Sequence, residues 1–198
     1  VIRGISSNIP FQAALLSHPD FVSGNFNTGF IAAHYAHGFR AEDVPHADPD
    51  FLVALAAFVR RRSRERAMAI SGQLPGYGVK VGQDFCVITL EATGAHRYTR
   101  VRVDEVVGQT GSAVITLAGK KYAITSHSRL NDICIHGECN GQPFTAQIER
   151  GTPRNPLALL VQHNGTRIET MVVSPRMAEL YRLMPFKPAP DMSKYVLS

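Results

Sequence analysis

The chain has 198 residues, of which 44% are hydrophobic and 19% are charged, and its formal net charge is +5. This length is enough for one domain with its own hydrophobic core. No apolar run reaches the ~20 residues that a membrane-spanning helix needs. The three cysteines are too few for a disulfide scaffold, which favours a reducing compartment. The positive charge permits nucleic acid, an acidic membrane surface or an acidic protein as a partner without choosing among them.

Two short helices are predicted near the start of the chain. Asn8 can cap the first of them, with Pro10 in its first turn. His18-Pro19 should end it, because the residue before a proline avoids the helical conformation. The second helix is expected near residues 28–35. Helices this short bury little surface, so we expect the region to pack against structure outside this chain.

A longer helix is predicted from Asp48-Pro49 to about Ala69, since a capping residue followed by proline is typical of a helix N-terminus. Its first half, residues 51–59, is apolar on every side, so other elements should enclose it. Its second half is rich in arginine and should emerge into solvent or meet a partner. These arginines are Arg60, Arg61, Arg62, Arg64 and Arg66.

Beyond a loop rich in glycine, the apolar pattern changes from helical to alternating. Asn140-Gly141 and Asn164-Gly165 lie between strand-like runs and are strong signals of a β-hairpin, and Ala118-Gly119 is a weaker one. Consecutive antiparallel strands suggest a closed barrel, which leaves no unpaired edge. Eight strands are predicted, at about residues 84–91, 97–106, 112–117, 121–127, 132–139, 142–149, 157–163 and 166–173.

The expected fold class is therefore α+β and mainly β: a long helix enclosed by an eight-stranded antiparallel β-barrel and preceded by short helices. A barrel of eight strands is usually filled by its own side chains, so a helix inside it requires larger shear or gaps. The small residues of the range 53–57 keep the helix slim. Ser174-Pro175 then begins a last helix with apolar spacing up to Pro185, and a proline-stiffened linker follows.

Cys134, His136 and Cys139 lie close together and invite a zinc interpretation. Their spacing does not match a zinc-finger ligand pair, and the sequence has no second pair. Cys134 and His136 would share one face of a strand, where ordinary packing also places such residues. We therefore interpret the three residues as structural and predict no metal site.

A catalytic site is equally unsupported by the sequence. Ser126, His127 and Asp132 could form a nucleophile and base, but no strand–turn–helix elbow surrounds them. Residues 72–82 hold several glycines but lead into a strand, so no helix N-terminus is offered to a phosphate. We predict no catalytic residue in this chain.

Nucleic acid would most readily bind the arginine-rich half of the long helix. Readers of single-stranded RNA interleave aromatic residues with such charges. The nearest aromatic residue, Phe58, belongs to the apolar half of the helix. A solvated helix end is therefore the preferred interpretation, and we expect neither nucleic acid nor a membrane as a partner.

Three opening segments resemble the end of a biotin carboxylase domain: Ile2–Phe11 (IRGISSNIPF), His18–Phe21 (HPDF) and Gly24–Ile31 (GNFNTGFI). The apolar helix, loop, strands and residues 174–180 that follow resemble propionyl-CoA carboxylase alpha chains, of the biotin-dependent acyl-CoA carboxylase family. The resemblance implies a long helix wrapped by an antiparallel barrel. It also implies that the loop between helix and barrel, the hook at about residues 69–83, grips the beta carboxyltransferase subunit. The implied protein-binding residues are Gln73, Leu74, Pro75, Gly76, Tyr77 and Val79.

The same resemblance implies the setting of the chain. Residues 1–46 would end a biotin carboxylase domain, 47–184 would form the subunit-interaction domain, and 185–198 would lead towards a biotinyl domain. The intact subunit would use biotin, ATP and Mg to carboxylate propionyl-CoA to methylmalonyl-CoA with bicarbonate. The nucleotide-binding residues would precede this chain and the biotin-bearing Ala-Met-Lys-Met motif would follow it, so we expect an internal piece without cofactor.

Partners and location follow from the resemblance in the same way. The expected partners are the beta subunit and the subunit's own biotin carboxylase and biotinyl domains. The expected location is the bacterial cytoplasm, or the mitochondrial matrix if the source is eukaryotic. Two alternatives stay open at this point: the same role in another acyl-CoA carboxylase, and a free-standing basic barrel that binds nucleic acid.

Overall fold

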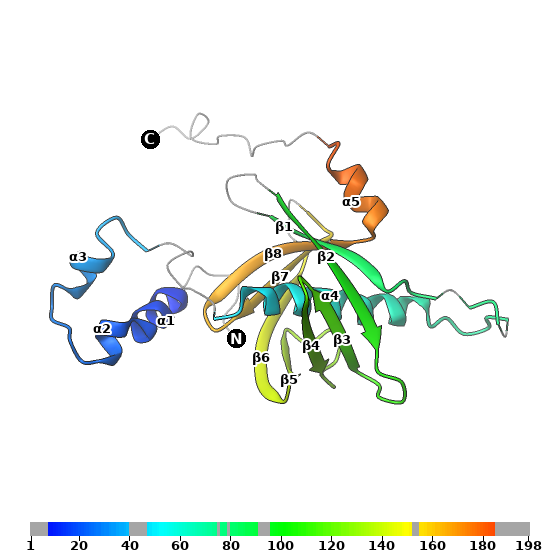
Figure 1. The fold of residues 1–198 in the computed structure, drawn as a ribbon, viewed down its shortest axis with the longest axis horizontal. Helices are drawn as coiled ribbons and strands as arrows, with labels where there is room; N and C mark the ends of the chain where they lie inside the picture. The colour runs from blue at the N-terminus through cyan, green and yellow to red at the C-terminus, as the bar shows by residue number, and fades with distance from the viewer. Residues whose placement is uncertain are drawn as a thin grey trace.

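The computed structural model describes residues 8–39, 47–74, 76–78, 80–90, 96–151 and 155–184 of the chain. Short helices lead to a long helix, a barrel of strands and a last helix (Figure 1). The helices are α1 (Ile9–Ser17), α2 (Pro19–Val22), α3 (Phe30–His34), α4 (Pro49–Met68) and α5 (Pro175–Tyr181). The strands are β1 (Asp84–Leu90), β2 (His96–Glu105), β3 (Ser112–Leu117), β4 (Lys120–Thr125), β5 (Cys134–Cys139), β6 (Gln142–Arg150), β7 (Ala158–His163) and β8 (Thr166–Val173).

The strands form one closed barrel in which each pairs with its neighbours in sequence. All pairings are antiparallel, and β1 closes the ring against β8, with Val87 opposite both Thr99 and Val172. The predicted fold class is confirmed, and each predicted strand agrees with the observed one to within two residues. The predicted linker at residues 185–198 lies outside the described residues.

The hairpin signals of the sequence mark tight turns as predicted. Asn140 and Asn164 have φ values of 51° and 46°, and the glycine that follows each has φ near 80°. Two successive left-handed residues give the turn whose twist matches that of the flanking strands, and asparagine and glycine adopt this conformation most readily. Ala118, with φ of 50°, occupies the same position without the asparagine side chain, which explains its weaker signal.

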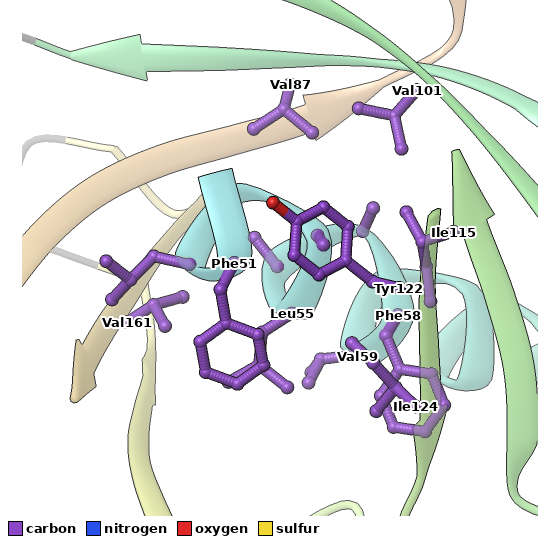
Figure 2. Packing of buried hydrophobic residues seen from close by; sticks show 14 of the residues in the cluster. Phe51, Leu55, Phe58, Val59, Val87, Val101, Ile115, Tyr122, Ile124 and Val161 are labelled. Atoms are coloured by element: carbon purple, nitrogen blue, oxygen red, sulfur yellow. The ribbon is translucent and has the colours of Figure 1, made fainter. Parts of the chain in front are cut away.

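Helix α4 runs through the barrel and supplies the centre of its core (Figure 1). Leu52, Ala54 and Leu55 have no exposed surface, and Phe58 is 1% exposed. Figure 2 shows Leu55 and Phe58 among side chains from the surrounding strands. Short side chains at Ala54, Ala56 and Ala57 let strands approach the helix closely. The predicted enclosure of the apolar half of this helix is confirmed.

The barrel makes room for the helix at the seam between β4 and β5, which pair through Ile124 with Cys139 and Thr125 with Glu138. Serine side chains bridge the strand ends where the backbone ladder stops. Ser126 Oγ donates to the carbonyl oxygen of His136 (2.7 Å), and Ser128 Oγ accepts from the His136 amide (2.9 Å). An eight-stranded barrel that encloses a helix needs a gap in its strand pairing, and this seam provides one. Ser126 is 1% exposed, and its hydrogen bond across the seam gives it a structural role.

A polar cluster closes the barrel at the N-terminal end of α4. The hydroxyl of Tyr122 donates to the carboxylate of Asp48 at 2.9–3.0 Å, and Lys120 Nζ lies 2.9 Å from Asp50 Oδ2. Asp48 occupies the N-cap position that the sequence predicts, but its side chain makes no cap hydrogen bond. Its carboxylate binds the barrel instead, because Tyr122 presents a buried hydroxyl that needs an acceptor.

Tyr122 should make the stability of the barrel sensitive to alkaline pH. Burial, first, and the hydrogen bond to Asp48 raise the pKa of Tyr122 well above its usual range. The neutral phenol therefore stabilises the fold below about pH 10, and this contribution is lost as the pH rises further. Tyr122→Phe should cost about 1.5 kcal/mol at neutral pH. In denaturant titrations, the difference in free energy of unfolding between the Tyr122→Phe variant and the unchanged chain should shrink above pH 10. A difference that stays constant with pH would contradict the proposed role of the Tyr122 hydroxyl.

Helix α5 packs on the outer surface of the barrel. Ser174 Oγ accepts from the amide of Met177 (3.2 Å), which confirms the predicted cap. The helix ends at Tyr181, earlier than the predicted limit near Pro185, and Leu183 beyond it is 80% exposed. Its contacts bury outward-facing residues of the first and last strands, so β1 is covered on both faces. This second cluster comprises Cys86, Ile88, Met171, Val173 and Ala178.

The short N-terminal helices pack through aromatic side chains. His18 ends α1, as predicted, but its imidazole Nδ1 also accepts from the Asp20 amide (3.2 Å) and so caps α2, a turn of helix that the sequence analysis missed. Phe30 is buried, whereas Val22 and Phe26 are 72% and 51% exposed. These exposed apolar residues support the expectation that the region packs on something further.

Candidate docking surface

Arg61 fixes the point at which α4 leaves the barrel. It is 6% exposed, forms ion pairs with Glu65 and Glu105, and donates from Nη1 to the carbonyl oxygen of Gly82 (3.0 Å). The prediction that this half of the helix emerges into solvent or meets a partner is therefore wrong at this residue. Two carboxylates and a carbonyl satisfy the guanidinium, which makes its burial tolerable. It contributes nothing to a basic surface for nucleic acid.

The hook, residues 69–83, is held at both ends. At its start, Gln73 Nε2 donates to the carbonyl oxygen of Met68 (2.6 Å), which folds the loop back on the helix. At its end, Gly82 is bonded by Arg61, and Gln83 accepts from both the side chain of Arg102 (2.7 Å) and the amide of Val103 (2.8 Å). These bonds join the hook to the helix and to β2, so its two ends are fixed by the barrel.

The middle of the hook is exposed and apolar at its tip. Leu74 is 71% exposed and Tyr77 83%, and Figure 1 shows the segment after α4 projecting beyond the barrel. Gln73 and Gly76 are exposed beside them. A β-carbon on Gly78 would lie 2.7 Å from Gln73 Oε1, the movable end of an exposed side chain.

The structure places four of the six predicted protein-binding residues together on this loop. Gln73, Leu74, Gly76 and Tyr77 are exposed there, whereas Pro75 and Val79 lie outside the described residues. Large apolar side chains held away from the core have no structural purpose in the isolated domain, which is typical of a binding surface.

A cleft of about 430 Å³ lies beside the exit of α4. It is lined on one side by Phe58 and Arg62 of the helix and on the other by the turn between β2 and β3. Val107, on that turn, is 97% exposed. The cleft has no signal in the sequence, because its walls come from segments about 45 residues apart with no shared pattern.

Cys134, His136 and Cys139 do not share one face of their strand. Cys139 packs against the core, whereas Cys134 and His136 lie on the opposite face of β5, so the three cannot share a metal ion. Burial raises the pKa of the thiols of Cys86 and Cys139, which disfavours the reactive thiolate.

One group of potential metal ligands does come together among the described residues. The ligand atoms of His18, Asp20 and His34 lie within 4.8 Å of one another, with no role predicted from the sequence. His18 Nδ1 already accepts a backbone hydrogen bond as the cap of α2, which accounts for its position.

None of the described helices is long and apolar enough to cross a membrane.

Fold and surface together define a helix-filled β-barrel domain that presents one anchored loop. Residues 52–187 match the family model of the propionyl-coenzyme A carboxylase BT domain, and the chain belongs to that family. It is 31% identical over 196 residues to the propionyl-CoA carboxylase alpha chain of Ruegeria pomeroyi, covering 99% of this chain and 27% of the relative.

Mitochondrial relatives show the same pattern of coverage. The identity is 27% over 204 residues to the propionyl-CoA carboxylase alpha chain of Caenorhabditis briggsae, covering all of this chain and 27% of the relative. It is 24% over 200 residues for the Rattus norvegicus chain, covering 26% of it. The chain thus spans about a quarter of the length of the curated relatives it matches, which include bacterial and mitochondrial proteins.

Proposed function

We propose that this chain is the joining and docking region of the biotin-carrying alpha subunit of a propionyl-CoA carboxylase, and that it binds the beta carboxyltransferase subunit through the hook. The observation that carries the proposal is the pair of exposed residues Leu74 and Tyr77 on a loop fixed at both ends, in a chain of this family. A loop that is fixed at its ends loses less entropy on binding than a free one, and tyrosine is a frequent source of binding energy at interfaces.

The proposed setting is that of a ligase subunit. Residues 1–46 end a biotin carboxylase domain, 47–184 form the docking domain and 185–198 lead to a biotinyl domain. The whole subunit uses biotin, ATP, Mg and bicarbonate in the bacterial cytoplasm or the mitochondrial matrix, and the partner carboxylates propionyl-CoA. No residue of this chain takes a chemical step. Its contribution is to hold the carrier near both active sites, which raises the effective concentration of biotin.

The double substitution Leu74→Ala with Tyr77→Ala should weaken assembly by at least about 30-fold, the effect of losing about 2 kcal/mol of binding energy. The measurement is mass photometry or sedimentation of the chain mixed with a propionyl-CoA carboxylase beta subunit over a dilution series. Thermal unfolding should be unchanged, because both side chains are largely exposed and outside the core.

The matched control is Val22→Ala with Ile31→Ala, which also truncates two exposed apolar residues, 72% and 51% exposed, away from the hook. This control should assemble like the unchanged chain. Assembly that survives the hook substitution at dilute protein would remove the hook from the interface. A complex with a beta subunit for branched acyl-CoA, in preference to the propionyl-CoA one, would assign the same role to another acyl-CoA carboxylase.

A further inference from the structure

Arg60 lies on α4 next to the ion-paired Arg61 and has a different environment. Its Nε atom is fully buried and has no hydrogen-bond partner among the described residues. A guanidinium N–H that is removed from water without an acceptor costs free energy, and such groups are rare in folded proteins. The described chain therefore leaves the Arg60 guanidinium without a compensating acceptor at this nitrogen.

Further arginines surround this donor. Burial and the positive charges of Arg64 and Arg150 lower the pKa of Arg60, and burial and the charge of Arg66 lower the pKa of Arg150. Within the described part of the chain, none of the four forms an ion pair with a carboxylate, although Arg61 and Arg102 both do. Repulsion among these like charges is relieved most directly by an anion between them.

Arg60 and Arg150 meet at a small pocket. It has a volume of about 140 Å³ and lies where α4 passes the start of β7, with Ser63 also in its wall. The hydroxyl of Ser63 donates to the carbonyl oxygen of Val59 (2.9 Å) and does not accept from Arg60 Nε, which has no partner among the described residues. Pockets for drug-sized ligands occupy roughly 300–1,000 Å³, so this one suits a single small group rather than a nucleotide.

We propose that Arg60 and Arg150 form a binding site for one oxyanionic group, a phosphate or a carboxylate, with Arg64 and Arg66 adding to the attraction. Guanidinium groups present paired N–H donors that match the oxygens of both groups. An anion in this pocket neutralises positive charges that the described chain leaves without a counter-charge. The site does not depend on the proposed docking role, because it is separate from the hook residues.

The experiment is a titration of the whole 198-residue chain with sodium phosphate, sodium sulfate or sodium acetate at constant ionic strength set with sodium chloride. Arginine-selective NMR follows the Nε–H signal of Arg60, and calorimetry gives the affinity. We expect a saturable shift of that signal, and at least about tenfold weaker binding in Arg60→Gln and Arg150→Gln, as for the loss of a charge-assisted hydrogen bond. Saturation by acetate at lower concentration than by phosphate assigns a side-chain carboxylate as the ligand, and the reverse assigns a free phosphate.

Two further variants make the result specific. Arg129→Gln removes the same charge from an exposed position elsewhere and should bind like the unchanged chain. Arg60→Lys keeps the charge but loses the paired donors, and it should bind weakly if geometry matters as proposed. Shifts that never saturate, or that are equal in all variants, would overturn the site as an adventitious effect of salt. That outcome leaves the hook experiment unaffected, because no beta subunit takes part here.

Discussion

Phe58→Ala should lower the free energy of unfolding by about 3–5 kcal/mol, the range found when a buried phenylalanine is truncated. The ring is 1% exposed and lies inside the barrel with other large side chains of its core (Figure 2). Strands surround the helix on all sides, so the barrel cannot collapse onto the cavity without breaking its own hydrogen bonds. The contact between the ring and the guanidinium of Arg62, 5.6 Å from its centroid, is lost as well.

Denaturant titration measures this effect, with Phe58→Leu as the matched control. Leucine keeps most of the volume and should cost less than about 1.5 kcal/mol. An alanine variant no less stable than the leucine variant would show that the site can rearrange, and the helix would not be the rigid centre of the fold. The control also separates loss of packing from loss of the aromatic contact with Arg62.

Most of the barrel is predictable from sequence because its signals are local. Asn140-Gly141 and Asn164-Gly165 each require two left-handed residues, and the chain provides them at the two turns. Alternation of Val101 and Val103 with charged residues assigns one face of β2 to the core, and both valines are at most 3% exposed. An all-round apolar helix then leaves enclosure as the simplest solution.

Features that depend on distant partners are not predictable in this way. Arg61 lies in an arginine-rich run that resembles a solvated helix end, but its partner Glu105 is 44 residues further along the chain. The serine bridges at the β4–β5 seam and the packing of α5 outside the barrel likewise join segments without a common pattern. In each case the sequence shows the residue type and its spacing, whereas tertiary structure decides its partner.

The proposed docking surface is only partly predictable from the sequence. Leu74 and Tyr77 are assigned to it through the family resemblance, and their exposure agrees with that expectation. The way the hook is held does not follow from the sequence, because it uses the side chain of Gln73 at one end and Arg61 at the other. The ion pairs of the buried Arg61 therefore connect the stability of the barrel with the geometry of the proposed interface.

The double substitution Glu65→Gln with Glu105→Gln should therefore destabilise the fold by about 2–3 kcal/mol, because it leaves the buried Arg61 guanidinium without a counter-charge at two positions that water partly screens. Arg61→Met should cost only about 1 kcal/mol, since the two glutamates are 38% and 61% exposed and can be hydrated, and methionine fills the buried space. Removing both carboxylates is thus expected to lower the free energy of unfolding more than removing the arginine that they neutralise.

Arg61→Met also tests the link to the hook, because it deletes the bond from Nη1 to Gly82 while keeping the barrel stable. Hydrogen exchange of the amides near residues 81–83 should become faster in this variant, and the proposed binding to a beta subunit should weaken as the hook loses its fixed end. Denaturant titrations rank the stabilities and exchange measurements report on the loop. Equal losses of stability in the arginine and glutamate variants would mean that side-chain packing, rather than charge balance, stabilises the region where α4 leaves the barrel. Unchanged exchange would mean that the contacts of Val81 and Gln83 fix the end of the hook without help from Arg61.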